Sequence, residues 1–441
     1  DTPPGELRQA SPQSLLLPEH LGEAMASARQ HLVAKAATEL VGTFFLCLTI
    51  ACTKSSAIPA IAIGCALMVL IYAGGHVSGA HYNPAVTVAI FVRGQGKIRP
   101  LEVAMYIVSQ LLGGLLGALV SWSVLIQGKE AAAYPALGWK VSVGSALICE
   151  FMLTLALCSV VLHVATTKAQ ANNSYYGLAI GFTVVSGAIS VGGISGGTFN
   201  PAVGLMSVLY DSGDAGNVWI YFLGPLLGGV VAGGLFRVAA CSEYTEAPST
   251  ALKRISPLLI EFLGTMMLCF TVGMSPWAGF LAPLSIGSIL MVMIYMGGSI
   301  SGAHYNPAVT LAVALRTYFG AIHDDFTAKK AVMYVPAQIL GALAGSLAAW
   351  GALEDNALVG YPSLPPSSDI LHGFLGEVIG TFLLVFVVLN VATVRSLAGN
   401  SFFGLAIGMV VTAMACAIGP ISGGAFNPAV GLIGVFTLGA G

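Results

Sequence analysis

One tetrapeptide, Asn-Pro-Ala-Val, constrains this fold more than any other feature. Its copies begin at residues 83, 200, 306 and 427, and each follows a glycine-bearing stretch: SGAHY, SGGTF, SGAHY or SGGAF. Asparagine is a preferred helix N-cap, and proline fits the first turn because its missing N–H would lack a partner there. About ten helix-compatible residues follow each copy, or about 15 Å, which is half of a bilayer core. We therefore expect half-length helices at 83–92, 200–210, 306–316 and 427–437.

Such half-helices suit a passage for neutral molecules. A helix N-terminus carries about half a positive charge and several unpaired N–H groups, so two facing N-termini disfavour any cation between them. The asparagine amides can still donate to a passing oxygen. The residues predicted at this position are Asn83, Pro84, Ala85, Asn200, Pro201, Ala202, Asn306, Pro307, Ala308, Asn427, Pro428 and Ala429.

The composition predicts an all-α polytopic membrane protein. The chain is 56% hydrophobic and 8% charged, against about 25% charged for soluble domains. A net charge of −2 gives no reason to expect nucleic acid, and the eight cysteines show no metal-ligand spacing, so we expect no metal site. Apolar runs predict spans near 36–53, 58–76, 101–126, 141–165, 174–194, 217–238, 256–274, 281–298, 328–350, 371–394 and 401–420.

The chain contains a nested repeat. Asn306 lies 223 residues after Asn83, and Asn427 lies 227 residues after Asn200, which defines a tandem period. We expect a tail at 1–31 with a short helix near 21–30, a first repeat at 32–240, a polar linker at 241–254 and a second repeat at 255–441. Two halves with odd numbers of spans within each repeat imply inverted topology around a midplane site.

The four motifs resemble those of the aquaporin, or major intrinsic protein, family, whose members carry two per six-span unit. The chain therefore resembles two aquaporins fused in tandem. The resemblance implies a passive channel for water or small neutral solutes, not an enzyme, with no cofactor. It also implies a lipid bilayer as surroundings and a homo-oligomer, in which two such chains supply four bundles. Asn83 is expected to pair with Asn200, each bundle having its own pore.

A Glu-x₃-Thr pattern precedes each motif by 44 to 50 residues, at Glu39, Glu150, Glu261 and Glu377. A buried acid in a span is expensive and is a functional candidate by default. We expect each glutamate to accept hydrogen bonds from the loop that leads to its half-helix, which the resemblance supports. A proton relay is the alternative.

The resemblance also assigns a selectivity filter, at Ile63, Ala188, Gly197 and Val203 in the first repeat and Ile286, Ala415, Gly424 and Val430 in the second. Water-selective members place an aromatic residue, a histidine and an arginine among these positions, with the arginine where Val203 and Val430 stand. Losing arginine removes a charge that repels cations, and the remaining residues make the constriction wider and apolar. Glycerol facilitators usually carry aspartate next, where this chain has Gly204 and Gly431.

Small-residue pairs, at Gly113/Gly117, Gly224/Gly228 and Gly341/Gly345, predict close helix packing rather than lipid-facing flexibility. His76, His81 and His304 precede the motifs and suggest either loop packing or a pH gate.

The second repeat has no counterpart of the 217–238 span before the sequence ends, which suggests either a trimmed sequence or a partner that covers the gap. Two other functions remain open. A secondary transporter would need ion-coordinating acids at the breaks, and none of the four motifs has one. A structural subunit of a larger membrane assembly would keep the fold without conducting.

Overall fold

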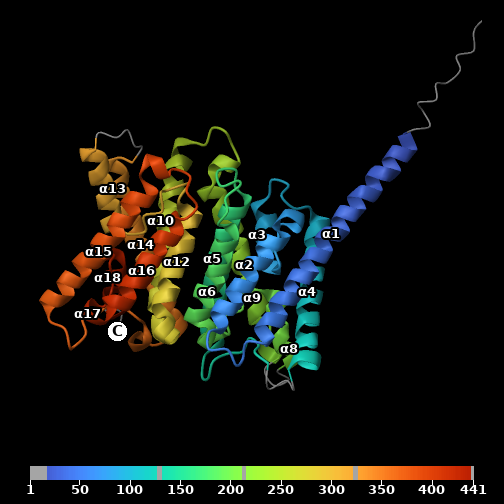
Figure 1. Cartoon of the computed structure of the whole chain (residues 1–441), viewed down its shortest axis with the longest axis horizontal. Helices are drawn as coiled ribbons and strands as arrows, with labels where there is room; N and C mark the ends of the chain where they lie inside the picture. The colour runs from blue at the N-terminus through green and yellow to red at the C-terminus, as the bar shows by residue number, and fades with distance from the viewer. Residues whose placement is uncertain (1–16, 127–131, 211–214, 321–325, 439–441) are drawn as a thin grey trace, which may run out of the picture.

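The computed structural model describes residues 17–126, 132–210, 215–320 and 326–438, and in these ranges the chain is helical with no strand. Ten of the described helices are long and apolar enough to cross a bilayer. Figure 1 shows them as two bundles side by side, with the first repeat in blue to green and the second in yellow to red. The expectation of an all-α polytopic membrane protein is confirmed.

Each bundle combines full-length helices with short ones that begin at the motifs. The first repeat contains α1 (Leu17–Ala51), α2 (Pro59–Ser78), α3 (Pro84–Arg93), α4 (Pro100–Val120), α5 (Val143–Thr166), α6 (Tyr176–Ser195), α7 (Pro201–Gly204), α8 (Met206–Tyr210) and α9 (Ile220–Ala239). The second contains α10 (Thr250–Gly273), α11 (Ser275–Ala278), α12 (Ala282–Gly297), α13 (Pro307–Phe319), α14 (Ala328–Leu353), α15 (Ile370–Ala392), α16 (Phe403–Ala417), α17 (Gly419–Ser422), α18 (Pro428–Gly431) and α19 (Ile433–Leu438).

Four expected elements differ from the structure. Residues 17–31, assigned to a tail with a short helix, continue into the first span as α1, because no glycine or proline interrupts residues 23–41. The span expected at 401–420 is helical without a break only over Phe403–Ala417, because Pro420 has no N–H to continue the ladder. The half-helices at 200–210 and 427–437 each break after a glycine, a weak helix former.

The glycine pairs lie at close helix crossings, so the packing interpretation is confirmed. A Cβ at Gly113 would meet the carbonyl of Leu40, which puts α4 directly on α1. The same arrangement puts Gly341 of α14 against the carbonyl of Phe262 in α10. Small residues let backbones approach where the bilayer supplies no hydrophobic drive between helices.

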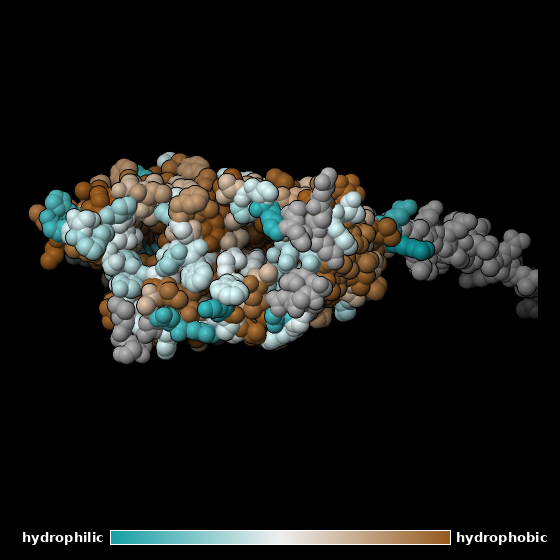
Figure 2. All heavy atoms as spheres, turned by 90° about the horizontal axis from the view of Figure 1, so that it is seen from below, coloured by the Kyte–Doolittle hydropathy of each residue, from teal (hydrophilic) through white to brown (hydrophobic). Residues whose placement is uncertain are grey.

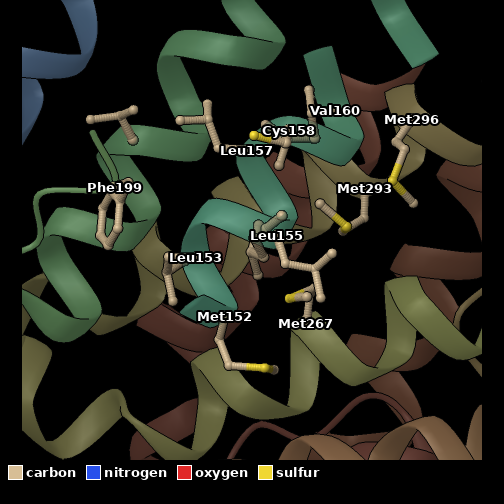
Figure 3. Close-up of a cluster of buried hydrophobic side chains, with 14 of the residues drawn as sticks. Met152, Leu153, Leu155, Leu157, Cys158, Val160, Phe199, Met267, Met293 and Met296 are labelled. Atoms are coloured by element: carbon tan, nitrogen blue, oxygen red, sulfur yellow. The ribbon is translucent and has the colours of Figure 1, made fainter. Parts of the chain in front are cut away.

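The two repeats meet mainly through α12, which packs on α6 and α5, while α14 also contacts α5 and α10 contacts α9. Figure 3 shows Met152 and Leu155 of α5 in one apolar cluster with Met267 of α10 and Met293 of α12. Polar contacts reinforce this interface. The hydroxyls of Ser186 in α6 and Ser285 in α12 each donate to the other residue's carbonyl at 2.9 Å.

A groove of about 440 Å³ runs between α13 and α15 in the second repeat. It is lined by Ala308, Ala312, Glu377, Val378 and Thr381, among others. The equivalent surface of the first repeat is covered by α9, whose glycines pack on α3 and α5. The described residues of the second repeat contain no helix equivalent to α9.

Candidate functional site

The four Asn-Pro-Ala motifs begin helices in the way their sequence predicts. Asn83 has an extended backbone, with φ −157°, and its Oδ1 accepts the N–H of Ala85 at 2.8 Å. Pro84 occupies the first helical position, where no N–H is needed. The same cap forms at the other three motifs, where Asn200, Asn306 and Asn427 accept the N–H of Ala202, Ala308 and Ala429.

Within each repeat the two asparagines form a reciprocal pair. Asn83 Nδ2 donates to the carbonyl of Phe199 at 2.7 Å, and Asn200 Nδ2 donates to the carbonyl of Tyr82 at 2.9 Å. Each asparagine therefore reaches the residue just before its counterpart, and the two helix N-termini face each other. The expected pairing of Asn83 with Asn200, rather than with Asn427, is confirmed.

The second repeat forms the same pair independently. Asn306 Nδ2 donates to Phe426 at 2.9 Å, and Asn427 Nδ2 donates to Tyr305 at 2.8 Å. The chain thus has two separate midplane sites, one in each bundle.

An unusual backbone leads into each helix. Before Asn83, Gly79, Ala80 and Tyr82 all have positive φ, at 87°, 51° and 49°. Non-glycine residues rarely adopt this conformation, and it persists only where the surroundings hold it. In this backbone the N–H groups of His81 and Tyr82 donate to Glu39, while the carbonyl of Tyr82 accepts from Asn200.

A buried glutamate holds this loop. Glu39 Oε1 accepts the hydroxyl of Ser78 at 2.6 Å and the N–H of His81 at 3.0 Å, while Oε2 accepts the N–H of Tyr82 at 2.7 Å. Glu150, Glu261 and Glu377 accept the same three kinds of donor from their own loops. The geometry is that of loop support, and a requirement for function stays a prediction.

Two glutamines belong to this network and were not foreseen from the sequence. Gln110 Nε2, on α4, donates to Glu39 Oε2 at 2.8 Å and lies 2.9 Å from the hydroxyl of Thr87 on α3. Gln338 makes the same two contacts in the second repeat, to Glu261 and Thr310. The sequence feature that could have revealed these glutamines is an uncharged polar residue at the same place in an apolar span of both repeats.

The far end of α3 is fixed as well. Arg93, fully buried, donates from Nε to the hydroxyl of Thr166 at 2.8 Å and pairs with Glu243 at 3.3 Å. Its guanidinium also lies over the ring of Phe236, at 4.9 Å. The half-helix is therefore held at both ends, by its cap and by this arginine.

Each bundle contains one elongated cavity that passes its asparagine pair. The first, of about 350 Å³, is lined along α2 by Ala60, Ile63, Leu67 and Ile71. The second, of about 200 Å³, follows α12 through residues Ala282, Ile286, Leu290 and Ile294. A stretch of twelve residues along a helix spans about 18 Å, so each cavity runs through more than half of a bilayer core.

The cavity walls are apolar with a few polar groups. In the described part of the chain, no Asp, Glu, Lys or Arg lines either cavity. Asn83, Asn200 and His81 line the first cavity; Asn306, Asn427 and His304 line the second. Figure 2 shows the molecule from below, where hydrophilic residues gather across the face beside hydrophobic ones and the surface is hollowed over the second repeat.

All eight positions assigned to the filter line these cavities, four in each: Ile63, Ala188, Gly197 and Val203 in the first, and Ile286, Ala415, Gly424 and Val430 in the second. Their role in selectivity stays a prediction. Of the three histidines considered for a pH gate, His76 lines neither cavity. His81 lines the first cavity, and a hydrogen bond of 3.0 Å joins its Nδ1 to the hydroxyl of Thr87.

Comparisons with known proteins agree with this geometry. The major intrinsic protein family matches residues 51–236 and again 248–439. Aquaporin NIP1-1 of Zea mays is 33% identical over 237 residues, covering 52% of this chain and 81% of the relative. Nodulin-26 of Glycine max is 35% identical, covering 48% and 79%. Aquaporin Z of Photorhabdus laumondii is 30% identical, covering 47% and 97%.

Among solved structures, an aquaglyceroporin from Plasmodium falciparum matches with a TM-score of 0.42 and 22% identity, over 48% of this chain and 97% of that one. Each single-unit relative covers about half of this chain, as a tandem repeat requires. Members of the family are membrane channels rather than enzymes. On its two family matches, one in each bundle, the chain belongs to the major intrinsic protein family.

Proposed function

We propose that this protein is a passive channel for water and small neutral solutes of the glycerol, urea, ammonia or peroxide class, with one conduit in each repeat. The observation that carries the proposal is the reciprocal asparagine pair set in an uncharged cavity, present twice. Facing helix N-termini oppose cations, and the free N–H of each asparagine amide can donate to a solute oxygen.

The filter proposal concerns the width and polarity of the cavities. Val203 and Val430 stand where an arginine would present five donors, and Gly197 and Gly424 contribute no side chain. A lumen of this composition can hold few solute molecules by hydrogen bonds, so selection rests mainly on size. We therefore propose that these cavities are less selective for water over other small solutes than a cavity with an arginine at this position.

Stopped-flow measurements on vesicles that contain the purified protein test the function. Water flux is followed under an osmotic gradient, and urea and glycerol entry under inward gradients. Permeability above that of empty vesicles, without proton or Na⁺ conductance, supports the channel. A protein that passes none of these solutes favours the alternative, a structural subunit of a membrane assembly.

We also propose that the chain forms a homo-oligomer, a dimer that brings together four bundles. Members of this family typically work as oligomers in the bilayer. The support in this structure is that the two repeats already pack through a helix interface with apolar and hydroxyl contacts.

A further inference from the structure

A third cavity lies at one end of the second conduit. It has a volume of about 730 Å³ and is found where α15 ends and α16 begins. Four of its lining residues also line the cavity of the second repeat: Ile294, Ala303, Val388 and Ile407. Because α12, α15 and α16 contribute to both walls, the two cavities adjoin. The larger one, called the entrance cavity below, is therefore the space that a solute meets before the second conduit.

Both repeats supply the wall of the entrance cavity. Residues 169–175, from the loop between α5 and α6 of the first repeat, line it together with most of residues 393–401 of the second. Figure 1 shows α6 and α12 side by side where the bundles meet, which brings this loop to the second repeat. By contrast, the described residues that line each conduit come from one repeat alone. The second conduit thus has an entrance whose wall is completed by the neighbouring repeat.

The loop at 169–175 is fastened to the second repeat by a buried glutamine. Gln170 is 6% exposed, and its Nε2 donates to the hydroxyl of Ser299 at 3.2 Å and to the carbonyl of Met296 at 3.4 Å. Its Oε1 accepts the hydroxyl of Tyr175 at 3.1 Å. The ring of Tyr175 in turn stacks on that of Tyr295, with centroids 4.2 Å apart and planes 15° apart. The loop is therefore held at a fixed place on α12.

The equivalent loop of the second repeat has the same internal structure. Asn173 Nδ2 donates to the carbonyls of Val164 and Gln170, each at 2.7 Å. Asn400, which lies 227 residues later, makes the same two bonds to its own loop. The two loops can therefore be compared position by position.

The groups that fasten the first loop are missing from the second. The residues equivalent to Gln170 and Tyr175 are Leu397 and Phe402, whose side chains have no hydrogen-bond donor or acceptor. The polar fastening is thus particular to the loop that lies at the junction between the repeats.

We propose that residues 169–175 of the first repeat form one wall of the entrance to the second conduit, so that neutral solutes bound for the second pore pass over a surface of the first repeat. The inference rests on the proposed function, because it assigns the entrance of a conduit. The first conduit keeps its own lining, so the two pores still run in parallel.

A bulky label on the loop tests the proposal. Ala171 is exposed and lines the entrance cavity, so Ala171→Cys gives the label a site there. The exposed native cysteines are removed by Cys52→Ser and Cys416→Ser. The variant is combined with Ala188→Trp, to leave the second conduit open, or with Ala415→Trp, to leave the first open. A bulky maleimide is attached in detergent before reconstitution, and mass spectrometry checks that labelling is complete.

Stopped-flow permeability to the solute that the wild type passes is then compared with and without the label. We expect the label to lower it about fivefold when the second conduit is open, because a bulky group on the wall obstructs entry. No change is expected when the first conduit is open. Lys168→Cys is the matched control, since Lys168 is exposed in the same loop but does not line the entrance cavity. Its label should change neither permeability.

The outcomes separate this inference from the channel function. Unlabelled variants that conduct, with a complete label on Ala171→Cys that changes nothing or lowers both conduits equally, overturn the entrance and leave the channel standing. Unlabelled protein that passes no solute in either background contradicts the channel itself.

A second readout does not depend on flux. Gln170→Leu copies the residue at position 397 and removes the amide contacts with Ser299 and Met296. Amide hydrogen exchange in residues 169–175 is expected to rise about tenfold, because the loop loses its bonds to the second repeat. Exchange in residues 393–401 of the same protein should stay as it is. Unchanged exchange at 169–175 would overturn the fastening of the loop, and with it the wall.

Discussion

At the scale of single residues, the midplane sites are built from amides instead of charges. Each asparagine uses Oδ1 to cap its own helix and one N–H to reach the opposite loop. The second N–H of the same amide is left for the cavity that the residue lines. The position of the side chain is therefore fixed, because the cap and the bond to the opposite loop together hold the amide that faces the cavity.

Replacing that amide by a carboxylate changes both roles. Asn83→Asp or Asn200→Asp can still cap its helix but cannot donate to the opposite carbonyl, and it puts a negative charge between two helix N-termini. We expect each variant to fold and to admit cations. Electrical conductance of a planar bilayer checks this, and cation exclusion unchanged in both variants would argue against a pore at this site.

Val203 and Val430 carry the residue-level prediction on selectivity. An arginine at each position would project a guanidinium into the lumen and narrow both cavities. The double variant Val203→Arg with Val430→Arg should lower urea or glycerol permeability more than water permeability. The opposite pair, Ile63→Gly with Ile286→Gly, should favour the larger solute. The ratio of solute to water permeability is measured in vesicles. A ratio that is unchanged in both double variants would show that these residues do not line the constriction.

At the scale of elements, each half-helix depends on the loop before it, and that loop keeps its conformation because a buried carboxylate accepts its hydrogen bonds. Glu39 satisfies two backbone N–H groups and a hydroxyl, and the loop has three residues at positive φ. Such a backbone is stable only while its donors are satisfied, since each unpaired buried group costs about 1–3 kcal/mol. The glutamate therefore acts on the half-helix through the loop.

Glu39→Gln tests this dependence. The new NH₂ group would face a donor, so we expect a loss of about 1–3 kcal/mol of unfolding free energy and a lower melting temperature in detergent. Glu377→Gln is the matched variant. Glu377 accepts the same kinds of donor but is only partly buried and lacks a glutamine partner like Gln110, so its loss should be smaller. A larger loss at Glu377 would contradict the account.

Local signals in the sequence account for most of the elements. The Asn-Pro pairs predicted the half-helix starts because a cap and a first-turn proline act within a few residues. The break before Pro420 is not predicted by the apolar run at 401–420, because hydropathy does not register the missing N–H of a proline. Gln110 was missed because its partners, Glu39 and Thr87, come from distant segments, and such a contact leaves no local pattern. The filter positions came from the family resemblance and not from any periodicity.

At the scale of the molecule, the described residues form two midplane sites, each in a cavity of its own, and the two cavities have no lining residue in common. The interface between the repeats is formed mainly by α5 and α6 of the first and α12 and α14 of the second, so the repeats pack together while each keeps its own cavity. This arrangement predicts that the two conduits work in parallel, each independent of the other.

The most direct test of this central claim is the additivity of flux. Ala188 lines the first cavity and Ala415 the second, so Ala188→Trp and Ala415→Trp should each fill one conduit. In vesicles with equal amounts of protein, permeability to the solute that the wild type passes is measured by stopped flow for both single variants and the double variant. We expect each single variant to lose part of the permeability, the two losses to sum to the whole, and the double variant to match empty vesicles. A single variant that abolishes flux, or a double variant that leaves it intact, would contradict two parallel pores.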